Sequence, residues 1–157
     1  MDERALTEQL IAYDTSGGEG IRRAAGFVRG WLESREVEVR ETHVRGLPVL
    51  VADAGPEGAP TTVLLHGHLD VVPGFPEQFA PRVEGERLYG RGAYDMKGGL
   101  AALMLAIADL QKVEGVRARL GIVPDEESEE EVERGCDVLV EEGFKGDFAI
   151  TGEPTDM

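Results

Sequence analysis

Apolar residues recur along the chain at two spacings, one typical of helices and the other of strands. The helical spacing predicts helices at Glu3 to Tyr13, Glu19 to Arg35, Gly98 to Lys112 and Glu130 to Glu142. Alternating or continuous runs of apolar and β-branched residues predict strands at Val37 to Val44, Leu47 to Ala52, Thr61 to Leu65, Arg87 to Tyr89, Val116 to Val123 and Phe148 to Thr151. Because strands alternate with helices, we expect an α/β fold: a three-layer sandwich with a largely parallel mixed sheet.

The composition of three segments also predicts their surroundings. The helix at Gly98 to Lys112 carries apolar residues around most of its circumference and should be buried. The continuous apolar strand at Thr61 to Leu65 should lie within a sheet that is covered on both faces. The segment from Val72 to Gly85 contains three prolines and no clear period, which predicts a long loop.

Acidic residues dominate the charge of this 157-residue chain, which is long enough for one domain with a core. The chain holds 31 acidic and 16 basic residues, for a formal net charge of −15. Such a charge repels nucleic acid and anionic membranes, so neither is expected as a partner. The N-terminus lacks a signal-like segment, and the longest apolar run, Leu100 to Leu110, is too short to span a membrane. A cytoplasmic location is therefore expected.

Cys136 is the only cysteine in the chain. A single cysteine cannot form an internal disulfide or a cysteine-based zinc site. Because no base motif surrounds it, Cys136 is expected to be a small buried apolar residue.

An imidazole and a carboxylate stand two residues apart at the end of an apolar stretch, as His68 and Asp70. Alternate residues of a strand share one face, so both side chains can point to one spot while Leu69 turns away. Proteins orient a zinc-binding histidine with a neighbouring carboxylate in this way. The alternative is a structural histidine.

Four further carboxylates each follow a strand-like run and are flanked by turn-forming residues: Asp95, Glu126, Glu127 and Glu153. The adjacent side chains of Glu126 and Glu127 must diverge, so they can serve two different roles. Each carboxylate also has a simpler explanation. Asp95 could cap the following helix, the glutamate pair belongs to an acidic run that could be solvated, and Glu153 lies in a Gly-Glu-Pro turn.

Together these ordered motifs resemble the zinc-dependent aminoacylase and carboxypeptidase family, from about the first helix to the last residue. That family includes acetylornithine deacetylase, succinyl-diaminopimelate desuccinylase, aminoacylase-1 and the glutamate-releasing carboxypeptidases. The motifs are Leu64 to Pro73, Gly90 to Gly99, Pro124 to Glu127 and Thr151 to Thr155.

The resemblance implies two zinc ions bridged by an aspartate and a water. It assigns His68, Asp95 and Glu153 to the first zinc, and the bridging Asp95 with Glu127 to the second. Cobalt or manganese could replace zinc in such ligand sets. Relatives also hold the peptide bond after this aspartate cis.

The resemblance further implies a metallopeptidase-type hydrolase that cleaves an amide with zinc-activated water. Glu126 is then the general base and Asp70 the carboxylate that orients His68. The expected substrate is a small N-acyl amino acid, such as acetylornithine or succinyl-diaminopimelate in amino-acid biosynthesis, with a small peptide as the second choice.

Family members are more than twice as long as this chain. After the Gly-Glu-Pro turn they insert a lid domain, and they later supply a final histidine to the second zinc, whereas no histidine follows His68 here. Residues 1–157 are therefore expected to be the N-terminal part of a co-catalytic zinc hydrolase domain, truncated and without the lid. The isolated chain is then weakly active or inactive. The alternative is a non-catalytic metal-binding or assembly module, and uncovered strand edges would favour a homo-oligomer.

Overall fold

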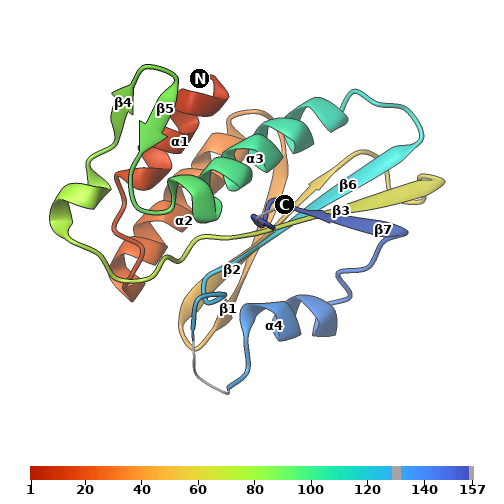
Figure 1. The fold of residues 1–157 in the computed structure, drawn as a ribbon. Coiled ribbons are helices and arrows are strands. Elements are labelled where there is room, and N and C mark those ends of the chain that lie inside the picture. Colours follow the sequence, from red (N-terminus) through yellow and green to blue (C-terminus); the bar gives the residue numbers. More distant parts are fainter. Residues whose placement is uncertain (129–131, 156–157) are drawn as a thin grey trace.

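The computed structural model describes residues 1–128 and 132–155. Its α-helices are α1 (Glu3–Ile11), α2 (Gly18–Glu33), α3 (Gly98–Leu110) and α4 (Gly135–Glu141). Its strands are β1 (Glu38–Val44), β2 (Leu47–Ala54), β3 (Thr61–His68), β4 (Arg82–Glu84), β5 (Arg87–Tyr89), β6 (Val116–Val123) and β7 (Phe148–Thr151). Two short helical segments, η1 (Pro76–Phe79) and η2 (Ala93–Lys97), complete the fold (Figure 1).

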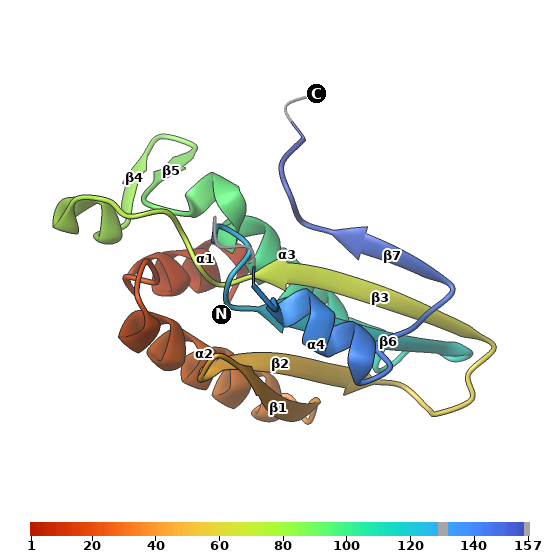
Figure 2. The same ribbon diagram turned by 90° about the horizontal axis from the view of Figure 1, so that it is seen from below.

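The main sheet has the strand order β1-β2-β6-β3-β7. Strand β2 is antiparallel to both β1 and β6, whereas β3 is parallel to both β6 and β7. Helices α1, α2 and α3 lie on one side of this sheet and α4 on the other (Figures 1 and 2). The predicted three-layer α/β sandwich with a mixed sheet is therefore confirmed.

The larger hydrophobic core fills the space between the sheet and the three helices α1, α2 and α3. Its fully buried members include Leu6, Leu10, Val28, Leu32, Leu50, Leu100, Met104, Ile107 and Leu120. A smaller apolar cluster lies under α4 and comprises Val44, Val49, Val51, Val123, Val138 and Leu139. Each helix contributes residues at helical spacing, so the sequence pattern accounts for the face of each helix that packs on the sheet.

The loop predicted at Val72 to Gly85 differs from the structure. The expected long loop contains η1, and Arg82–Glu84 forms the short strand β4, which pairs with β5. Gly85 makes this hairpin possible, because its φ of 59° closes a tight turn. Strand β3 alternates between buried and half-buried residues, so its two faces are covered to different extents.

The last helix is shorter than the expected span of Glu130 to Glu142. Positions 129–131 lie outside the described residues, and α4 begins at Gly135, whose amide is bound by the Asp125 carboxylate. Within residues 1–128 and 132–155, none of the helices has the length and apolar character needed to cross a lipid bilayer.

Candidate metal centre

The candidate residues lie beyond the carboxyl ends of the three parallel strands. Strand β3 ends at His68, β6 leads into Glu126 and Glu127, and β7 leads into Glu153. Asp95 lies in η2, directly before α3. Ligands bind at this edge of α/β sheets because the loops that follow parallel strands meet there.

His68 stands at the centre of the cluster and is 1% exposed. Its Nε2 lies 3.1 Å from Asp95 Oδ1 and 3.5 Å from Glu153 Oε2. The ligand atoms of these three residues all lie within 4.8 Å of one another. The structure therefore brings together the three residues that the resemblance assigns to the first metal.

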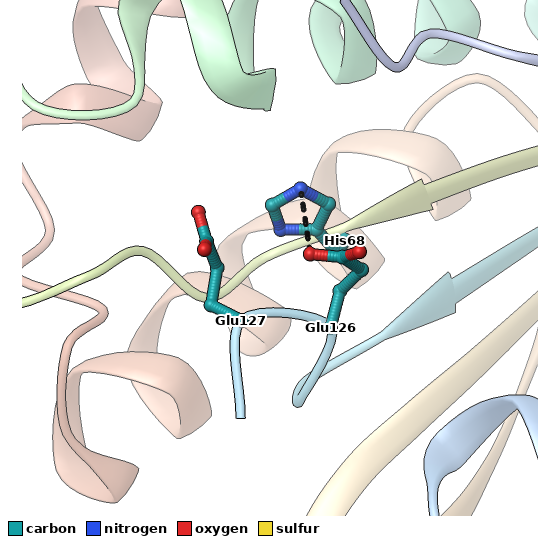
Figure 3. Close-up of side chains that lie close together, drawn as sticks. All are labelled: His68, Glu126 and Glu127. Carbon is teal, nitrogen blue, oxygen red and sulfur yellow. Dashed lines mark ion pairs between the residues drawn. The ribbon is translucent and has the colours of Figure 1, made fainter. Parts of the chain in front are cut away.

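Glu126 and Glu127 lie near the same imidazole. Glu126 Oε2 is 4.0 Å from His68 Nε2, and both glutamate side chains extend from their turn toward the imidazole (Figure 3). His68, Glu126 and Glu127 form a second group whose ligand atoms lie within 4.8 Å. Glu127 and Asp95 also line one cavity of about 280 Å³, as a shared second metal would require.

Asp70 connects the two halves of the cluster. Its Oδ1 lies 3.3 Å from His68 Nδ1, which is also 3.0 Å from the Asp70 carbonyl oxygen. The same carboxylate accepts hydrogen bonds from the backbone amides of Glu126 (3.1 Å) and Glu127 (2.8 Å). One buried side chain thus orients the imidazole and holds the turn that carries both glutamates.

Asp95 is not the cap of the following helix. The N-cap of α3 is Lys97, and no side chain caps it. The Asp95–Met96 peptide is cis, as the resemblance predicted. Lys97 anchors this segment, because its buried Nζ donates a 2.8 Å hydrogen bond to the Tyr13 carbonyl. The Asp95 carboxylate remains about two-fifths exposed and points toward His68.

Burial and neighbouring charges together govern the ionisation of this cluster. Burial lowers the pKa of His68, but the hydrogen bonds and charges of Asp70, Asp95 and Glu153 outweigh it and raise that pKa to about 9. Burial, assisted by the charge of Asp95, raises the pKa of Glu127 and of Glu153. Imidazole nitrogen and carboxylate oxygens form the donor set of a divalent cation such as zinc, which would relieve this repulsion. The residues present therefore fit a metal ion.

The metal-free protein is expected to lose stability as the pH rises. The pKa of His68 is about 9 in the folded chain, above its ordinary value of 6.5. Its charged imidazolium thus stabilises the fold fully below about pH 6.5, and this contribution disappears as the pH passes about 9. The change should be on the order of a few kcal/mol in the free energy of unfolding. Urea unfolding with a chelator, at pH 6.5 and 9.5, measures it. A His68→Asn variant with the same pH dependence would contradict the assignment.

The structure corrects the prediction for Cys136. This residue is exposed in the first turn of α4, and its Sγ lies 3.4 Å from His66 Nε2. His66 belongs to neither of the candidate metal groups found among the described residues. Two further residues were missed: the buried Asp125 and the exposed Arg45, which form an ion pair beside the glutamate turn. Asp125 sits in an acidic run, and its place directly after an apolar strand was the only signal of burial.

Comparison with known proteins finds similar sequences. The model of peptidase family M20/M25/M40 matches residues 64–157. The chain is 39% identical over 146 residues to succinyl-diaminopimelate desuccinylase of Xanthomonas euvesicatoria, covering 85% of this chain and 35% of that protein. It is 39% identical over 93 residues to LysW-lysine/LysW-ornithine hydrolase of Sulfurisphaera tokodaii, covering 59% of this chain and 25% of that protein. The chain thus spans about a third or less of the length of these two relatives.

Solved structures share the fold. An M20 family metallo-carboxypeptidase of Sulfolobus solfataricus superimposes with a TM-score of 0.79 at 27% identity, covering 97% of this chain and 37% of that one. Human carnosine dipeptidase 1 superimposes with the same TM-score of 0.79 at 20% identity, covering 97% of this chain and 38% of that one. The second likeness concerns the fold alone.

Proposed function

Because the chain belongs to peptidase family M20/M25/M40, we propose that it carries part of the active site of a metal-dependent amide hydrolase. The convergence of His68, Asp95 and Glu153 at the carboxyl edge of the sheet is the observation that carries the proposal. Residues 1–157 then correspond to the part of such a catalytic domain that supplies the ligands of the first metal.

The proposed substrate is a small N-acyl amino acid. The sequence relatives include a succinyl-diaminopimelate desuccinylase, whose name describes removal of an acyl group from an amino acid. Succinyl-diaminopimelate or acetylornithine is therefore our first choice, and cleavage of a small peptide is the second. The chemistry is the same in both cases, since each reaction hydrolyses an amide bond.

The proposed roles follow from the contacts. His68, Asp95 and Glu153 hold one metal, and Glu127 with Asp95 contributes to a second. Zinc, when bound, polarises the amide carbonyl and makes water nucleophilic near neutral pH. Glu126 projects from the turn toward the same space, where its carboxylate can take a proton from the attacking water and deliver it to the leaving amine. Asp70 fixes the imidazole and the glutamate turn.

The first test is the metal content of the pure chain. Elemental analysis after dialysis against trace zinc is expected to find one zinc per chain, removable with a chelator. A stoichiometry of two would mean that the second group also binds. No bound metal at neutral pH would contradict the proposed first site.

A metal-binding module without turnover is the second candidate. Both candidate groups among the described residues share His68, so they offer a single imidazole for two metals. Measured hydrolysis of N-acetyl amino acids by the zinc-loaded chain separates the candidates. We expect slow turnover at best, and rapid turnover would exclude the module.

A further inference from the structure

Asp125 is a buried carboxylate within an acidic run. It follows the last strand residue of β6 by two positions and directly precedes Glu126. Its side chain is 3% exposed, whereas that of Glu126 is 44% exposed. A buried carboxylate costs several kcal/mol unless charged or hydrogen-bonded partners compensate for the lost water. The partners of Asp125 therefore indicate what the residue does.

Three contacts compensate this carboxylate, and they come from two other elements. Arg45 Nη2 lies 2.9 Å from Asp125 Oδ2. The amide of Gly135, the first residue of α4, lies 3.0 Å from Oδ1 and 3.2 Å from Oδ2. Arg45 belongs to the turn between β1 and β2, which lies at the same end of the sheet as the carboxyl end of β6 (Figure 1).

The Arg45 backbone has an unusual conformation for this contact. Its φ is 51°, in the left-handed region that residues other than glycine rarely occupy. The following Gly46 also has a positive φ, of 75°. This turn directs a guanidinium across 80 positions of sequence to the start of the glutamate turn. Because the Asp125 contacts engage both the β1–β2 turn and α4, they restrain the backbone immediately before Glu126.

The backbone immediately after Asp125 is held by two other side chains. The Asp70 carboxylate accepts both the Glu126 and the Glu127 amides. Arg134 Nη1 also donates a 3.0 Å hydrogen bond to the Glu126 carbonyl. The direction in which the two glutamates extend thus depends on buried carboxylates that touch neither His68 Nε2 nor Glu153.

We propose that Asp125, paired with Arg45, is a positioning residue that fixes the backbone of the Glu126–Glu127 turn. Its consequence for metal binding rests on the function proposed above, whereas its effect on the turn does not. Asp125 acts through its neighbours and is not itself a ligand in this proposal.

Amide hydrogen exchange of the metal-free chain tests the effect on the turn. Asp125→Ala and Arg45→Met are expected to speed exchange of the Glu126 and Glu127 amides by on the order of tenfold, because local opening becomes easier. Arg45→Lys should restore part of the protection. Asp53→Asn is the matched control, since Asp53 is a half-buried carboxylate that pairs with Arg40, Arg117 and Arg119 away from the site.

Zinc titration of the same variants tests the consequence. With excess zinc, Asp125→Ala should weaken binding of a second zinc, which Glu127 would hold, by about 10-fold or more, as expected when a supporting contact behind a ligand is lost. Asp53→Asn should lower thermal stability without changing the zinc affinity. If Asp125→Ala does not fold, amide exchange and zinc titration are measured on Asp125→Asn and Arg45→Met instead.

The outcomes are distinct. Exchange at Glu126 and Glu127 that responds to Asp125 and Arg45 variants no more than to Asp53→Asn would overturn the proposal. Faster exchange at the turn in a chain that binds no zinc would support the positioning role and contradict the proposed metal site. Faster exchange with unchanged zinc affinity would limit the role to the backbone and remove its consequence for the metal.

Discussion

Replacing His68 with alanine is expected to weaken zinc binding by on the order of 100-fold or more, because supporting contacts alone contribute 10- to 100-fold. Both candidate metal groups among the described residues contain this imidazole, so its loss removes a ligand from each. The remaining carboxylates would also lose the group that offsets their mutual repulsion. Isothermal titration with zinc at pH 7, backed by elemental analysis, measures the effect.

His66→Ala is the matched control for this experiment. His66 lies two residues earlier on the same strand, and its Nε2 contacts Cys136 rather than a candidate ligand. Its zinc affinity should stay close to that of the unaltered chain. Equal loss of zinc in the two variants would show that the strand, and not the His68 imidazole, supports binding.

Glu126→Gln is expected to lower the hydrolysis of an N-acyl amino acid by about 10² to 10⁴-fold while the zinc content stays unchanged. Glutamine keeps the size and much of the hydrogen bonding of the side chain but cannot accept a proton. The measurement compares initial rates of amine release by the zinc-loaded chain and variant, at equal zinc occupancy. If the isolated chain turns over too slowly, the pair is compared after mixing with the C-terminal half of a relative.

Glu127→Gln provides the opposite case at the neighbouring position. Both side chains extend from one turn toward His68, but only Glu127 is assigned as a ligand, so the same substitution should here weaken binding of a second zinc (Figure 3). An unchanged rate in Glu126→Gln, or loss of zinc from that variant alone, would contradict the division of roles between the two glutamates. If Glu126→Gln lost zinc and Glu127→Gln lost only hydrolysis, the roles of base and ligand would be reversed.

Local pattern determined most of the elements. The bounds predicted for β6 and β7 agree with the structure, since both strands are apolar runs that end in turn residues. Strand β5 was predicted, but its partner β4 was missed because three prolines and the lack of a clear period predicted a loop, although Pro81 precedes β4 and leaves its hydrogen bonds intact. The beginning of α4 depends on a carboxylate ten positions earlier, which no local pattern reveals.

The candidate site was predicted in the same way, residue by residue, from motifs and a family resemblance. His68 and Glu153 could be singled out because they lie where β3 and β7 end at one edge of the sheet, whereas Asp95 was singled out by a motif that resembles the family. The roles assigned to them remain predictions that the experiments above address. The burial of Asp125 and the exposure of Cys136 were not predicted, because both depend on which element packs beside them.

The sequence by itself therefore determined the α/β fold, the family and the residues with metal-binding chemistry, since these follow from periodicity and motifs along the chain. Only the tertiary structure decided that one Asp70 carboxylate joins the imidazole to the glutamate turn, and that Arg45 pairs with Asp125 across 80 positions. The physical reason is that buried charges are satisfied by whichever partners the packing brings within hydrogen-bonding distance. The separation of two residues along the sequence does not indicate how far apart they lie in the fold.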